Sequence, residues 1–120
     1  MGYCVVLSTA ASQGEAEKIA GALLESRAAS CVQIEPIVSL YHWKGKIERT
    51  NEMRLLIKTT DVLYPRVESL IRENHSYEVP QIVKLPINAG LPEYLGWISE
   101  ETSFNPQTRA AMKHHAGGTG

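Results

Sequence analysis

Three side chains that could do chemistry together lie close in the sequence, at His75, Tyr77 and Glu78. They place an imidazole, a phenol and a carboxylate within four residues. A neutral imidazole is a good ligand for copper, zinc or nickel, so His75 is the best candidate metal ligand. One histidine does not make a metal site, however, and a histidine hydrogen-bonded at the end of a helix is the commoner arrangement.

A second group of polar and aromatic residues could form a binding cleft. Glu52 and Lys58 are six residues apart, so the alternation of a strand puts both on one face. A neighbouring subunit could bring three aromatic side chains to them: Tyr41, Trp43 and Tyr77. Such a cleft suits a small anion or zwitterion, with Lys58 as its cation. An ion pair between subunits that fixes their register is the competing interpretation.

The remaining histidines and cysteines favour structural or adventitious roles. Cys4 and Cys31 lie in apolar, strand-like runs and are too few for a disulfide framework, so we expect buried free thiols. Cys31 as a soft ligand for Cu(I) is the alternative. His114 and His115 could bind copper or nickel, but nothing near them would hold the ligands in place. The sequence has no phosphate-binding loop and no nucleophile motif.

Length and composition predict one ordinary globular domain. The chain has 120 residues, of which 43% are hydrophobic and 21% charged, with a formal charge of −1. This balance calls for neither a nucleic acid nor an anionic membrane as partner. The sequence shows no long apolar run and no signal peptide, so we expect a cytoplasmic protein.

The most distinctive predicted element is a hairpin of two long strands, at residues 32–43 and 46–59, joined by Lys44-Gly45. Each strand would extend roughly 35–40 Å, whereas a usual strand has about 5–6 residues. Pairing Trp43 with Lys46 puts an apolar face at the base of the hairpin, into the domain core. The tip carries apolar side chains that a solvated hairpin does not need: Leu40, Tyr41, Trp43 and Ile47. We therefore expect a homo-oligomer, with an exposed amphipathic hairpin as the alternative.

The whole pattern predicts an α+β fold of the ferredoxin-like βαββαβ type, with an additional C-terminal helix and the elongated hairpin. Ser12 and Glu15 match a capping box, in which each satisfies the other's backbone amide. The other expected strands are at 3–7 and, as an edge strand, at 81–87. One helix should start at Ser12, a second should be capped by Thr60 or Asp61, and a third should start at Pro92. The inward residues are Ala16, Ile19, Ala20, Leu23 and Leu24 in the first helix and Leu63, Val67, Leu70 and Ile71 in the second. Pro65 should delay the first turn of the second helix. Residues 1–102 form the predicted domain and 103–120 a flexible tail.

Residues 3–102 resemble the CutA family of divalent-cation tolerance proteins. The resemblance rests on several short matches in the right order: Ala29-Ser30-Cys31-Val32, Tyr41, Trp43-Lys44-Gly45-Lys46, Glu52, Leu56-Ile57-Lys58-Thr59, His75, Tyr77-Glu78-Val79-Pro80, Leu85-Pro86-Ile87, Gly90, Tyr94-Leu95 and Trp97-Ile98. Single matches are weak, but together they are specific. The resemblance implies a homotrimer of ferredoxin-like subunits, similar in assembly to PII-type signalling proteins, whose 32–59 hairpins wrap around their neighbours.

The same resemblance implies a role in tolerance of copper and other divalent ions. In bacterial members described as copper-binding, the ligands are a cysteine at the end of the first strand and a pair of histidines. This chain has Ser8 in place of the cysteine and Asn74 before His75. We therefore expect at most weak copper(II) binding at His75, and no metal required for folding.

The sequence thus favours a cytoplasmic, non-enzymatic homotrimer that acts in divalent metal ion tolerance. The alternative is a PII-like sensor that binds a small anion between subunits. A third interpretation is an enzyme that uses His75, Tyr77 and Glu52 for acid–base chemistry.

Overall fold

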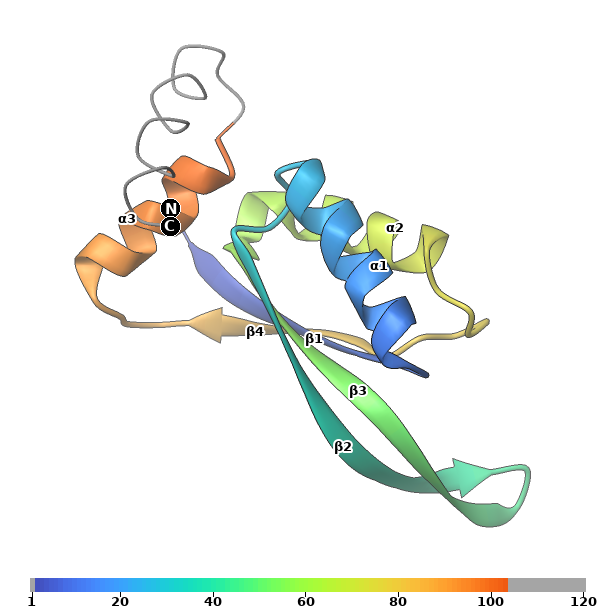
Figure 1. Cartoon of the computed structure of the whole chain (residues 1–120). Coiled ribbons are helices and arrows are strands. Elements are labelled where there is room, and N and C mark those ends of the chain that lie inside the picture. The colour runs from blue at the N-terminus through green and yellow to red at the C-terminus, as the bar shows by residue number, and fades with distance from the viewer. Residues whose placement is uncertain (1, 104–120) are drawn as a thin grey trace.

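Four antiparallel strands form one sheet in the order β2-β3-β1-β4, and the computed structural model describes residues 2–103 (Figure 1). The elements are β1 (Tyr3–Ala10), α1 (Gln13–Glu25), β2 (Cys31–Trp43), β3 (Lys46–Thr60), a 3₁₀ turn η1 (Asp61–Leu63), α2 (Tyr64–Glu73), β4 (Ile82–Ile87) and α3 (Pro92–Glu101). This order confirms the predicted α+β, ferredoxin-like arrangement. The predicted tail from residue 104 onward, with His114 and His115, lies outside the described residues, so the extent of the domain stays a prediction.

The core lies between the sheet and helices α1 and α2, which cover one face of it (Figure 1). Every second residue of β1 is fully buried there, and Leu55 and Ile57 of β3 join them. The strand runs three residues past its predicted end, because Ser8, Thr9 and Ala10 continue the pairing with β3. Helix α3 packs apart from this layer; Ser99 is hydrogen-bonded to Tyr3 at the start of β1.

Two details of α1 differ from the prediction. The Ser12 side chain does accept the amide of Glu15, but the Glu15 carboxylate accepts the amide of Ala11 instead of completing the capping box with Ser12. Leu24, expected in the apolar stripe, is 42% exposed, whereas Leu23 is fully buried. The sequence therefore predicted one core residue too many on this helix, namely Leu24.

Helix α2 starts late, as Pro65 predicts. The chain first forms η1, and Pro65 then occupies the first turn of α2. The expected side-chain cap is absent, since Thr60 precedes η1 without a capping hydrogen bond. Val67 and Ile71 are buried as predicted, while Leu63 and Leu70 are only partly buried.

The long hairpin forms in the predicted register, with Trp43 opposite Lys46. Strand β1 ends at the pair Ala10–Met53, so β3 has no second partner beyond it. Residues 37–52, here named the ribbon, are therefore two-stranded and extend away from the helices (Figure 1). Leu40 and Ile47 on the ribbon are 67% and 71% exposed, and Trp43 is 57% exposed. The apolar tip thus has no cover within the described part of the chain.

Strand β4 is the other edge of the sheet, as predicted, and it contains one proline, Pro86. Pro86, which has no backbone amide to donate, pairs with Cys4 of β1. Over residues 2–103, no helix has the length and apolar content needed to cross a membrane.

We expect Ile57→Ala to lower the free energy of unfolding by about 2–5 kcal/mol, because it leaves a cavity where a fully buried side chain packed. Val62→Ala is the matched control. Val62 is 78% exposed, so its truncation should change stability by less than about 0.5 kcal/mol. Urea denaturation at one fixed protein concentration measures both. Equal losses in the two variants would contradict the assignment of the core.

Candidate functional site

His75 lies just after α2, where the segment leading to β4 passes the end of β1. Its Nδ1 accepts the backbone amide of Tyr77 at 3.0 Å. Because Nδ1 accepts, Nε2 carries the ring proton and donates it to the carbonyl oxygen of Thr9 at 2.6 Å. Both ring nitrogens are therefore held by backbone groups. A metal ion could bind His75 only by displacing one of these partners.

Tyr77 ties this segment to the base of the ribbon. Its hydroxyl donates to Oε2 of Glu52 at 2.8 Å, and its ring lies 4.8 Å from that of His75. Burial, followed by the hydrogen bond to Glu52, raises the pKa of Tyr77 to about 12. The carboxylate that meets the phenol is thus Glu52 and not the neighbouring Glu78, which is exposed. Three predicted site residues, Glu52, His75 and Tyr77, come together within one subunit.

Glu15 also belongs to this cluster, although the sequence predicted it only as a helix-capping residue. Its carboxylate accepts the amide of Ala11 at 3.0 Å and the amide of Ser76 at 2.8 Å. Burial raises the pKa of Glu15, but the hydrogen bonds from Ser76 and Ala11 outweigh burial and lower it overall. Glu15 therefore fastens the start of α1 to the segment that carries His75. The capping-box pattern signalled a structural role for Glu15, but not its bond to a residue far along the chain.

The two other positions at which the resemblance suggested copper ligands have different roles. Ser8 is fully buried and its hydroxyl donates to the carbonyl of Gln81 at 2.7 Å. The Asn74 side chain donates to the carbonyl of Leu70 at 2.8 Å. Within residues 2–103, no group of three or more His, Cys, Asp and Glu side chains is placed to hold a metal ion. Copper binding at His75 stays a prediction.

Two of the three aromatic members of the predicted cleft, Tyr41 and Trp43, lie toward the ribbon tip. Tyr41 shares a hydrogen bond of 2.8 Å with the hydroxyl of Thr50. Trp43 is more than half exposed, and the Lys44 ammonium lies 5.6 Å from the centre of its ring. Tyr41 is near enough to Tyr77 to contribute to the raised pKa of that phenol, whereas Trp43 is farther along the ribbon.

Lys58 lies at the opposite end of β3. Its ammonium donates to Oε1 of Gln33 at 3.0 Å and lies 5.7 Å from the centre of the Tyr94 ring. Six residues of strand separate Lys58 from Glu52, roughly 20 Å. One small ligand could not contact both within a subunit. The predicted cleft therefore needs a second subunit and stays a prediction.

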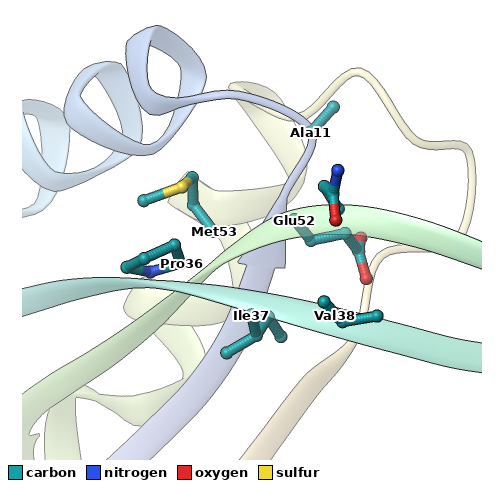
Figure 2. A pocket seen from close by; sticks show the side chains of 7 residues that line it. Ala11, Pro36, Ile37, Val38, Glu52 and Met53 are labelled. Atoms are coloured by element: carbon teal, nitrogen blue, oxygen red, sulfur yellow. The ribbon is translucent and has the colours of Figure 1, made fainter.

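A pocket of about 350 Å³ lies where the ribbon leaves the sheet (Figure 2). It is lined by Ala11, Pro36, Ile37, Val38, Asn51, Glu52 and Met53. Figure 2 shows Pro36 and Met53, which pair across the strands, on one side of the pocket and the Glu52 carboxylate on the other. No motif predicts this pocket, because it arises from the point at which β1 ends beside the continuing hairpin.

Glu15→Gln should remove part of the pH dependence of stability in acid. Because the folded-state pKa of Glu15 lies below its ordinary value of 4.5, ionised Glu15 stabilises the folded chain above pH 4.5. That contribution is lost as the pH falls through the lower folded-state pKa. We measure the urea concentration at the midpoint of unfolding at several pH values. Between pH 4.5 and lower pH, this midpoint should fall less for the variant than for the original chain. Glu17→Gln, on the exposed face of α1, is the control; an equal effect in both variants would contradict the assignment.

The family model for the CutA1 divalent ion tolerance protein matches residues 4–101. The divalent-cation tolerance protein CutA of Thermus thermophilus is 44% identical over 99 residues, which cover 82% of this chain and 96% of that protein. Mouse protein CutA is 41% identical over 105 residues, which cover 87% of this chain and 59% of the mouse protein. The structure of the periplasmic divalent cation tolerance protein CutA from Archaeoglobus fulgidus matches with a TM-score of 0.83 at 40% identity, over 84% of this chain and 99% of that one. The chain therefore belongs to the CutA1 family of divalent ion tolerance proteins.

Proposed function

We propose that this chain acts in divalent metal ion tolerance as a homotrimer, with each ribbon packed on a neighbouring subunit. The ribbon is the observation that carries the proposal. Its apolar side chains have no cover from residues 2–103, and burying one leucine-sized side chain is worth about 1.5–3 kcal/mol. The family supplies the link to metal tolerance, and the resemblance supplies the copy number.

A second uncovered surface supports closed assembly. Val83 and Leu85 of β4 are exposed on the sheet face opposite α1 and α2, where they pair with Leu7 and Val5 of β1. A ribbon and an open sheet face are two different surfaces. When one subunit's ribbon packs on the next subunit's open face, the contact is head-to-tail, and a suitable rotation closes it into a ring.

The proposed role is non-enzymatic. Glu52, His75 and Tyr77 do lie together, as acid–base chemistry would require. Yet His75 has a backbone partner at each ring nitrogen. The pKa of Tyr77 is raised to about 12, so its hydroxyl keeps its proton at neutral pH. Groups held in this way favour a structural role over proton transfer near neutral pH.

Leu40→Glu and Ile47→Glu should each weaken self-association by about tenfold or more, because each puts a charge into the proposed interface. Val62→Glu, a similarly exposed apolar site away from the ribbon, should have no such effect. Light scattering over a dilution series measures assembly, and circular dichroism checks folding. A folded monomer of the original chain at micromolar concentration would overturn the proposal, as would ribbon variants that assemble normally.

For copper(II) we propose weak binding at His75. The support is an imidazole within the family's sequence pattern. Its affinity is limited because binding must displace either the Tyr77 amide or the Thr9 carbonyl, and because Ser8 and Asn74 offer no soft or imidazole ligand.

A PII-like sensor for a small anion is the second candidate function, and Lys58 is the observation that favours it. The ion pairs among residues 2–103 join Arg27 to Glu101, Arg54 to Glu35 and Lys84 to Asp61, and none uses Lys58. Its ammonium is hydrogen-bonded to two neutral groups within the described residues, the side chains of Gln33 and Tyr94. A cation without a carboxylate partner beside an aromatic ring suits an anionic ligand.

Calorimetric titrations separate the two ligand classes. Copper(II) should give weak binding that survives truncation after Thr102 and disappears in His75→Ala. Absence of heat in both the full chain and the truncation would rule out direct ligation. Inorganic phosphate should bind in the sensor case, with binding lost in Lys58→Ala and kept in the exposed-site control Lys18→Ala.

We also propose a cytoplasmic location. Cys4 and Cys31 are both free thiols, with Cys4 buried and Cys31 partly buried. Burial, followed by the nearby Asp61 charge, raises the pKa of Cys4 to about 11. Two free cysteines, one of them buried with a raised pKa, fit a reducing compartment.

A further inference from the structure

The charged side chains of the ribbon take part in none of the ion pairs found among residues 2–103; they are Lys44, Lys46, Glu48, Arg49 and Glu52. Of these, Glu52 lies at the base of the ribbon and Lys44 at its tip. The half-buried Glu52 carboxylate accepts one hydrogen bond, from Tyr77 to Oε2. Each charge therefore remains available to a group from outside the subunit.

Lys44 is an unexpected residue for its place in the turn. Its φ is 50° and that of Gly45 is 78°, so both have the left-handed conformation that this tight turn needs. Glycine or asparagine adopts it readily, whereas other residues pay about 1–2 kcal/mol. Residues held at such a cost cluster at functional sites. The Lys44 ammonium lies 5.6 Å from the centre of the Trp43 ring, so the tip presents an exposed indole and a cation together.

The pocket at the base of the ribbon has the complementary chemistry. Pro36, Val38 and Met53 give it apolar walls, and Glu52 gives it a negative charge (Figure 2). A group with an apolar body and a positive end would satisfy both. That description fits the tip of the ribbon.

We propose that the Trp43-Lys44 tip of one subunit docks in the ribbon-base pocket of a second copy, where Lys44 pairs with Glu52. Within one subunit this contact cannot form, because β3 separates its tip at Lys46 from Glu52 by roughly 20 Å. The inference rests on the proposed self-assembly and specifies which residues meet in it. Glu52 then receives Tyr77 at one oxygen and the neighbour's ammonium at the other.

Zero-length carbodiimide cross-linking of the full chain tests this contact. Equal amounts of ¹⁵N-labelled and unlabelled chains are unfolded and refolded together, cross-linked and analysed by peptide mass spectrometry. The expected product joins Lys44 to Glu52, with one labelled and one unlabelled peptide. An oligomer that lacks this product overturns the docking contact but leaves the proposed assembly intact. A monomer by light scattering overturns both.

A double-mutant cycle supplies an independent readout. Glutamine at either position removes a charge; at residue 52 it still accepts the Tyr77 hydroxyl, and at residue 44 it remains a non-glycine turn residue. Lys44→Gln and Glu52→Gln should each raise the concentration at which the oligomer dissociates by about tenfold, and the pair together by no more than either alone. Lys46→Gln, also near the tip, is the control. Additive effects, or no effect in an oligomer that Leu40→Glu still weakens, would overturn the proposal and point to a small organic cation as the pocket's occupant.

Discussion

The structure depends on one constraint: β2 and β3 stay paired well beyond the point where β1 ends. Up to the pair Ala10–Met53, β3 has a partner on each side and a helical layer above it. Past that pair, the backbone groups of the two strands still hydrogen-bond to each other, but no helix among residues 2–103 covers their side chains. Backbone pairing thus holds the ribbon together while leaving its apolar surface uncovered. The pocket follows from this mismatch, and so do the proposed assembly and the predicted cleft.

The base of the ribbon is held by a short chain of polar contacts. Glu15 binds the segment after α2 through Ser76, His75 binds the end of β1 through Thr9, and Tyr77 binds Glu52. These contacts join α1, β1 and β3 at the point where the ribbon begins. A two-stranded hairpin is at best marginally stable by itself in water, so these contacts stabilise the ribbon where it leaves the sheet. The residues that first suggested chemistry therefore hold the base of the ribbon, which is the proposed interaction surface.

Local patterns predicted the hairpin register well, because the apolar face at its base leaves one arrangement in which Ile34 and Leu55 face the core. The capping hydrogen bonds at the helix starts were less predictable than the starts themselves. Whether Glu15 caps Ser12 or binds Ala11 and Ser76 depends on a segment sixty residues away, which no local pattern contains. For the same reason, Leu24 looked like a core residue until the packing of α1 put it at the edge of the interface.

By itself, the sequence determined the order of elements, the long hairpin with its register, and the six residues around which a site could form. The alternation of apolar and polar residues and the positions of turns are local properties, so they can be read from the sequence without the tertiary structure. The tertiary structure decided how those six residues group: Glu52, His75 and Tyr77 together, Tyr41 and Trp43 toward the tip, and Lys58 at the far end of β3. It also decided that both nitrogens of His75 are already in use and that Glu52 faces a pocket. These outcomes depend on where β1 stops relative to the hairpin and on which backbone groups the segment after α2 meets, and both are set by three-dimensional packing.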